Sequence, residues 1–103
     1  MSTINQSEWR YYGQSATSTL TAADTWTNWT PFLGKFDFSI SGAWVGTITL
    51  QRSFDRGVTS VDVERYTANI EDEGSTNTVG IMYRAGFQVG EYTSGAAIVR
   101  ISQ

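Results

Sequence analysis

Cysteine and histidine are both absent from this chain of 103 residues. Without cysteine it forms no disulfide, iron–sulfur cluster or thiolate zinc site. Without histidine it lacks the usual base of a catalytic triad and the commonest neutral metal ligand. The remaining side chains suit only a hard cation held by oxygen atoms. We therefore expect the protein to need no metal and no other cofactor.

Positive charge is also scarce. The chain has a single lysine, Lys35, and six arginines, and its net charge is −3. This balance argues against nucleic acid as a partner, because phosphate binding requires a basic face. Lysine is depleted and arginine enriched at protein interfaces, so the composition also fits a surface covered by other proteins, or simply chance in a short chain.

Long hydrophobic runs are also missing, and proline occurs only once. No apolar run approaches the ~20 residues of a membrane helix. The opening residues, MSTINQSEWRYYGQS, lack the basic start and apolar stretch of a secretory signal. We therefore expect no membrane contact and no signal peptide. The single proline, Pro31, is expected to end an edge strand that contains Trp29.

Alternation of apolar and polar residues is the strongest pattern present, and no window keeps the 3.6-residue period of a helix. Residues 35–41 alternate cleanly, and residues 45–54 and 61–66 continue the pattern. Residues 80–89 are apolar on both faces, which indicates a central strand. The residues expected in the core are Phe36, Phe38, Ile40, Ile48, Leu50, Phe54, Val61 and Val63. The residues expected on the surface include Thr47, Thr49 and Gln51.

Turn residues divide these strands. Residues 41–46 (SGAWVG) and 90–95 (GEYTSG) are expected to join consecutive strands, and residues 71–78 (EDEGSTNT) to form an acidic loop. Closely spaced short strands predict an all-β fold, an antiparallel β-sandwich or a small barrel. Of these we expect the antiparallel β-sandwich, with about seven or eight strands, immunoglobulin-like or jelly-roll-like. We expect residues 16–103 to form this single domain and residues 1–15 to form an extended N-terminal arm.

One local motif lies between two strands, in residues 53–60, SFDRGVTS. A short carboxylate such as Asp55 accepts hydrogen bonds from backbone N–H groups nearby, and Gly57 adopts a positive φ at little cost. Ser53 and Thr59 are placed to join the strands across the turn. The Ser-x-Asp-x-Gly-x-Thr spacing resembles the Asp-box hairpin of sialidases and related β-proteins, although the aromatic residue that usually follows the threonine is missing. In that family the motif lies away from the catalytic site. We expect Asp55 to hold a turn, with catalysis or a calcium or partner contact as the alternatives.

The other carboxylates give no catalytic pattern. A glycosidase needs two facing carboxyl groups, one of them with a pKa raised by burial. Asp37, Asp62 and Glu64 all fall on the polar phase of their strands, so we expect them to be solvated. The acidic residues 71–73 lack the spacing of an EF-hand, which makes calcium a weaker alternative than simple solvation. We therefore expect no enzymatic activity.

Aromatic residues are abundant, and several lie outside the core pattern. Such residues act as anchors at protein interfaces, as stacking platforms for sugars, or as a secondary core. Tyr83 followed by Arg84 is expected as a core pair rather than a surface site. The candidate partner-binding residues are Trp9, Arg10, Tyr11, Tyr12, Trp26, Trp29 and Trp44.

Two longer segments, FDFSISGAWVGTITLQRSFDRGVTSVDVERYT and YRAGFQVGEYTSGAAIVRIS, make residues 17–103 resemble small β-sandwich proteins from the virions of tailed bacteriophages. In such proteins a strand reading G-T-x-T-L-Q-R-S-F-D runs into an Asp turn, and a Y-T-S-G-x-A hairpin precedes the last strand. The resemblance implies a structural role in the virion, on the capsid surface or in the tail, after assembly in the host cytoplasm.

Two hypotheses follow. The first is a capsid decoration, or cement, protein that binds capsid or tail subunits and copies of itself, with many weak contacts acting together. The alternative is a carbohydrate-binding or receptor-binding module of a tail fibre or secreted protein, with Trp26, Trp29 or Trp44 stacking on a glycan. An exposed row of aromatic rings favours the second hypothesis.

Overall fold

The computed structural model describes residues 14–103, and that part of the chain contains strands and no helix. All strands pair antiparallel within one sheet. This confirms the predicted all-β antiparallel fold. Among these residues there is accordingly no helix long and apolar enough to cross a membrane. The strands are β1 (Ser15–Leu20), β2 (Thr25–Trp26), β3 (Thr30–Pro31), β4 (Gly34–Ser53), β5 (Val61–Tyr66), β6 (Ile70–Thr76) and β7 (Met82–Ser102).

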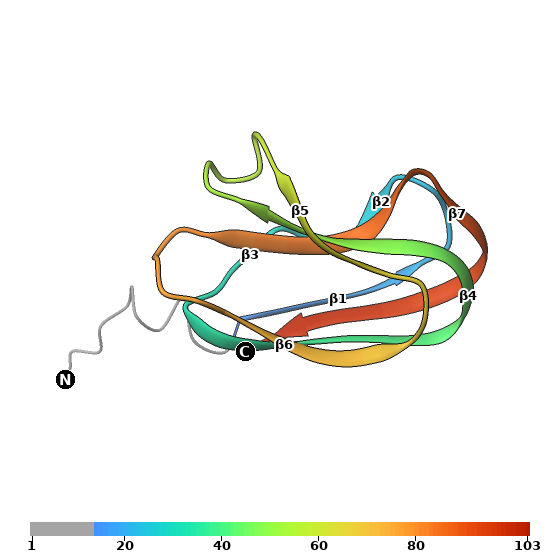
Figure 1. Cartoon of the computed structure of the whole chain (residues 1–103), viewed down its shortest axis with the longest axis horizontal. Coiled ribbons are helices and arrows are strands. Elements are labelled where there is room, and N and C mark those ends of the chain that lie inside the picture. The colour runs from blue at the N-terminus through green and yellow to red at the C-terminus, as the bar shows by residue number, and fades with distance from the viewer. Residues whose placement is uncertain (1–13) are drawn as a thin grey trace.

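The two long strands, β4 and β7, form a ribbon that folds back on itself (Figure 1). The expected breaks at residues 41–46 and 90–95 are wrong, because both strands continue through these segments and pair with each other there, with shifts of register on both sides of Gly46. Glycine makes the bend possible. Gly42 and Gly95 have φ values of 97° and 89°. A Cβ at Gly95 would lie 2.2 Å from the carbonyl oxygen of Ala43.

Folding the ribbon produces two layers, which lie one above the other in Figure 1. In the upper layer, the second half of β4 and the first half of β7 are flanked by β5 on one side and by β2 and β3 on the other. In the lower layer, the first half of β4 and the second half of β7 are flanked by β6 and β1. The two layers belong to one seven-stranded sheet that is continuous through the bend.

The core lies between the layers and is rich in aromatic side chains. Phe36, from the lower layer, stacks on Phe32 with 4.7 Å between ring centroids, and its ring lies 4.6 Å from that of Tyr83 in the upper layer. The alternation of the first half of β4 is confirmed, and so are two inward residues of its second half. These buried residues are Phe36, Phe38, Ile40, Ile48 and Leu50.

Three residues expected in the core are exposed instead. Phe54, which is 64% exposed, lies in the turn just beyond the end of β4. Val61 and Val63 belong to β5, which is not paired with β6. The two edge strands leave an open groove between the layers, and Val63 lines it. The inner face of β5 is therefore only partly covered.

The prediction was also wrong for Thr49 and Gln51, which were expected on the surface and are buried. They lie on the outer face of the upper layer, opposite Gly86 and Arg84 of β7. Arg84 donates a hydrogen bond to the Gln51 side chain, so this outer face carries side chains that cover their neighbours. Alternation of apolar and polar residues identifies a strand that is buried on one face. It fails here because the outer face of the upper layer is covered as well.

The acidic segment expected to be a loop at residues 71–78 is largely strand β6, which pairs with β4 from Gly34 to Ile40. Gly74 permits this pairing, because a Cβ there would lie 2.5 Å from the Phe36 ring. β6 forms an edge of the sheet, and its consecutive carboxylates at residues 71–73 are exposed. Charged side chains on an edge strand oppose further strand pairing.

Candidate functional site

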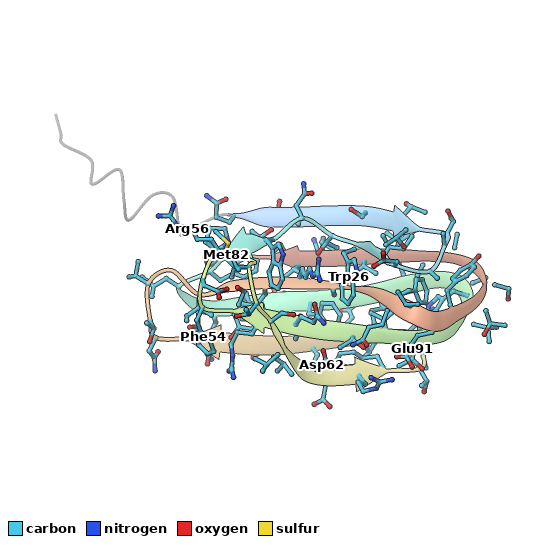
Figure 2. The ribbon with its side chains drawn as sticks, turned by 90° about the horizontal axis from the view of Figure 1, so that it is seen from above. Trp26, Phe54, Arg56, Asp62, Met82 and Glu91 are labelled. Atoms are coloured by element: carbon cyan, nitrogen blue, oxygen red, sulfur yellow. The ribbon has the colours of Figure 1, made fainter. Side chains whose placement is uncertain are left out.

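Two tryptophans and an arginine stack on the outer face of the upper layer. The Arg84 Cζ atom lies 4.0 Å from the ring centroid of Trp26 and 4.6 Å from that of Trp29. Trp26 in β2 pairs with Gly86, and Trp29 directly precedes Thr30 of β3, which pairs with Tyr83, so both indole rings lie beside Arg84 of β7. Figure 2 shows Trp26 over the middle of this face. We call these three residues the Trp–Arg stack.

A chain of hydrogen bonds holds the arginine in place from one side. Arg84 Nε donates to Gln51 Oε1 at 2.9 Å, and Gln51 Nε2 donates to Asp62 Oδ1 at 2.9 Å. The other Asp62 oxygen accepts from Gln88 Nε2 at 3.0 Å and lies 3.9 Å from an Arg65 nitrogen. The Gln51 amide, then that of Gln88, lowers the pKa of Asp62, so this carboxylate is ionised at neutral pH.

Tyr83 and Arg84 do not form the core pair expected from the sequence. Tyr83 is buried between the layers, whereas Arg84 lies half-buried on the outer face. Consecutive strand residues point to opposite sides of a sheet, so only one of the pair can face the core. The inward positions Tyr83, Ala85 and Phe87 leave Arg84 on the outside, and this parity was the signal available in the sequence.

Among residues 14–103, Asp55 accepts side-chain hydrogen bonds only from its own turn. Its Oδ1 accepts from the Thr59 backbone N–H at 2.9 Å and from the Ser53 hydroxyl at 2.8 Å, and its Oδ2 accepts from the Thr59 hydroxyl at 2.6 Å. These bonds, led by the Thr59 hydroxyl, lower the pKa of Asp55 from the usual 3.8 to about 2. The Gly57 N–H donates to Ser53 Oγ at 2.7 Å, and Gly57 has a φ of 91°. The carboxylate is therefore directed into the turn.

The Asp55 turn also packs against the Trp–Arg stack. A Cβ at Gly57 would lie 2.7 Å from Trp29 Nε1 and 2.8 Å from Trp29 Cδ1. Glycine thus lets the turn approach the indole ring closely, in addition to adopting the positive φ. The turn and the two short strands together fix the position of Trp29.

Replacing Asp55 by alanine is expected to lower the melting temperature at pH 7 by several degrees, on the order of 4–8 °C. The substitution leaves the Thr59 N–H and two hydroxyl groups without their acceptor. Thermal unfolding followed by circular dichroism measures the change. An unchanged melting temperature would contradict the structural role of this carboxylate.

The same turn predicts a dependence on pH. Because the folded pKa of Asp55 is about 2 and its usual value is 3.8, its ionised form stabilises the fold above about pH 4. That stabilisation is lost as the pH falls toward 2. Asp55→Asn has no charge to lose, so the difference in melting temperature between this variant and the natural chain is expected to shrink between pH 5 and pH 2. A constant difference would show that the carboxylate does not titrate with this shift.

Trp44 lies apart from the other two tryptophans, at the bend of the ribbon. Its Nε1 donates to Asn69 Oδ1 at 2.7 Å, and Asn69 Nδ2 donates to the Gly42 carbonyl at 3.0 Å. Its ring meets Phe87 edge-on, with 5.8 Å between centroids. Trp44 and Asn69 line an open hollow of about 520 Å³. The structure therefore brings together Trp26 and Trp29 and leaves Trp44 at a second place.

The remaining candidates, Trp9, Arg10, Tyr11 and Tyr12, lie outside the described residues, and their role in partner binding stays a prediction. The structure begins its first strand at Ser15, one residue inside the expected arm. Comparison with protein families, with curated proteins and with solved structures gave no match. The chemistry of the surface itself is therefore what indicates its function.

Proposed function

We propose that this chain is a non-enzymatic structural protein that binds other protein subunits through the Trp–Arg stack, and that it does so as a decoration protein of a tailed-phage capsid. The observation that carries the proposal is the stack of Trp26, Arg84 and Trp29 on an outer face. Tryptophan and arginine are the residue types most enriched among interface residues that dominate binding energy.

Rigidity of the stack supports binding. Trp26 lies in β2 and Trp29 directly precedes β3, both of which pair with β7, and a hydrogen bond from Arg84 to Gln51 fixes the guanidinium. A surface already held in one conformation loses little conformational entropy when a partner covers it. The buried Thr49 and Gln51 beneath show that this face is packed even without a partner.

The pKa shifts of three described groups, Asp55, Asp62 and Tyr66, support a role without proton transfer. The pKa values of Asp55 and Asp62 are lowered by hydrogen bonds, so both stay ionised near neutral pH. Burial, aided by the Asp72 carboxylate, raises the pKa of the Tyr66 phenol, which therefore stays protonated. A general acid or base works best with a pKa close to the working pH, and all three shifts run away from it.

The capsid setting rests on the resemblance of residues 17–103 to small virion proteins. On a shell with many copies, contacts that are weak singly give stable attachment together. A surface built around three half-buried side chains suits such repeated contact. The setting predicts that the chain is present in purified particles of the phage that encodes it, and its absence there would contradict the proposal.

Replacing both Trp26 and Trp29 by alanine is expected to weaken attachment to these particles by about tenfold or more. Particles assembled without the chain are mixed with purified protein, and bound and free protein are separated by sedimentation. Val79→Ala is the matched control, because Val79 is an exposed apolar residue outside the stack. A double variant that stays folded and attaches as strongly as the control variant would contradict the proposed surface.

Trp44 supports a second candidate function, the binding of a carbohydrate. Its ring lines the open hollow at the bend together with hydroxyl and amide side chains of Thr67, Asn69 and Ser94. An aromatic ring beside a few polar groups is the usual composition of a small-ligand site. In the Trp–Arg stack, by contrast, Arg84 occupies a face of each ring. Glycan binding that is lost in Asn69→Ala and kept in the Trp26/Trp29 double variant would support this alternative.

A further inference from the structure

Arg84 retains unused hydrogen-bonding capacity. An arginine side chain has five N–H donors. Within residues 14–103, Arg84 makes one side-chain hydrogen bond, from Nε to Gln51, and no ion pair. Its two terminal nitrogens therefore have no protein acceptor in this part of the chain. Arg65, by comparison, pairs with both Asp62 and Glu91.

Within residues 14–103, no carboxylate forms an ion pair with Arg84. Asp24 is close enough to raise its pKa slightly against the larger effect of burial, which lowers it. Asp24 accepts a hydrogen bond from Trp26 Nε1 at 3.3 Å and forms no ion pair with Arg84. Asp62 is already bonded to Gln51 and Gln88. The guanidinium is thus held beside two indole rings, partly removed from water, with its terminal nitrogens available.

The free terminal nitrogens of Arg84 suit a planar anion. They form one edge of the guanidinium, and they are not among the buried unpartnered side-chain atoms of residues 14–103, so a ligand can reach them. A carboxylate is planar and accepts two parallel hydrogen bonds from such an edge, a geometry that arginine offers and lysine does not. Because Arg84 is half-buried, its attraction to a bound carboxylate is stronger than it would be in water.

We infer that Arg84 binds an acidic side chain, aspartate or glutamate, of the protein partner, with the carboxylate held in the guanidinium plane beside Trp26 and Trp29. This inference rests on the proposed protein-binding function and names the chemistry of its central contact. A protein partner follows from the proposed function, and Arg84 already covers one face of each indole ring, a face on which a sugar would stack.

The test is a titration of the full chain with acetyl-glutamate amide, with acetyl-glutamine amide as the matched neutral probe. Indole N–H signals in a ¹H–¹⁵N spectrum report on Trp26, Trp29 and Trp44, and single tryptophan-to-phenylalanine variants assign them. We expect the glutamate probe to shift the Trp26 and Trp29 signals saturably at concentrations on the order of millimolar. The Trp44 signal is expected to stay in place. The glutamine probe is expected to bind at least tenfold more weakly.

Arg84→Lys keeps the positive charge and loses the planar pair of donors, so its affinity for the glutamate probe is expected to fall at least tenfold. Equal responses to the glutamate and glutamine probes in the natural chain would overturn the inference, and that comparison needs no variant. Tighter binding of glucuronate than of the glutamate probe would overturn the assignment to a protein partner.

Particle attachment separates this inference from the proposed function. If attachment depends on Trp26 and Trp29 while the natural chain does not distinguish glutamate from glutamine, the inference fails and the proposed surface stands. If attachment is unchanged in the tryptophan double variant, the proposed function fails, whatever the probe titration shows.

Discussion

Replacing Phe87 by alanine is expected to lower the free energy of unfolding by about 3–5 kcal/mol. Phe87 has no exposed surface, and its ring meets those of Trp44 and Tyr92 edge-on, with centroids 5.8 and 5.0 Å away. These contacts lie where the ribbon of β4 and β7 bends. The free energy of unfolding of a domain is about 5–15 kcal/mol in total, so this one substitution removes a large share of the stability.

Chemical denaturation followed by circular dichroism measures the loss. Phe54→Ala is the matched control, because it removes the same ring from a residue that is 64% exposed. It is expected to change stability by about 0.5 kcal/mol or less. Similar losses for the two variants would show that the bend is not packed around Phe87.

The first half of β4 could be read from the sequence because one face of it is covered and the other is open to water. Phe36, Phe38 and Ile40 alternate with polar residues, and each is buried. The upper layer has packed side chains on both of its faces, so Thr49 and Gln51 were misplaced. Period-two alternation reports burial on one face only.

The bend and strand β6 were missed for a different reason. Glycine-containing segments such as 41–46 and 90–95 have the same composition in a turn between two strands and in a kink within one strand. Cross-strand pairing, such as Trp44 with Gly95, distinguishes the two, and pairing is not a local property. The carboxylates of β6 likewise have low strand propensity, and pairing with β4 overrides it.

In the candidate site, too, some residues could be predicted from the local sequence and one could not. The Asp55 turn was found because all of its partners lie within seven residues, from Ser53 to Thr59. Trp26 and Trp29 were found because they fall outside the core pattern. Strand parity alone would have placed Arg84 on the outer face, but its position beside the two tryptophans depends on pairing between segments 51 to 62 residues apart in the chain.

Gly86→Ala is expected to disturb stability and the Trp–Arg stack together. A Cβ at Gly86 would lie 2.1 Å from the Thr25 carbonyl oxygen and 2.7 Å from Trp26 Cα. Both are backbone atoms and cannot rotate away, so β2 has to move. That movement breaks the bonds between Thr27 and Ala85, which are 2.9 and 3.1 Å long. We expect a loss of about 2–3 kcal/mol in the free energy of unfolding, as for overpacked sites.

Gly90→Ala is the control variant that distinguishes the steric clash at Gly86 from backbone strain. Gly90 has a φ of 80° with nothing within 4 Å of its Cβ position, so alanine there adds strain and no collision. Gly86 is not among the positive-φ glycines, so its effect is steric alone. We expect Gly90→Ala to cost about 1 kcal/mol and to leave the indole N–H signal of Trp26 in place. Gly86→Ala should shift that signal, because Trp26 moves away from Arg84. If Gly86→Ala leaves stability and the Trp26 signal unchanged, β2 does not hold the stack against β7, and the binding surface would need another support.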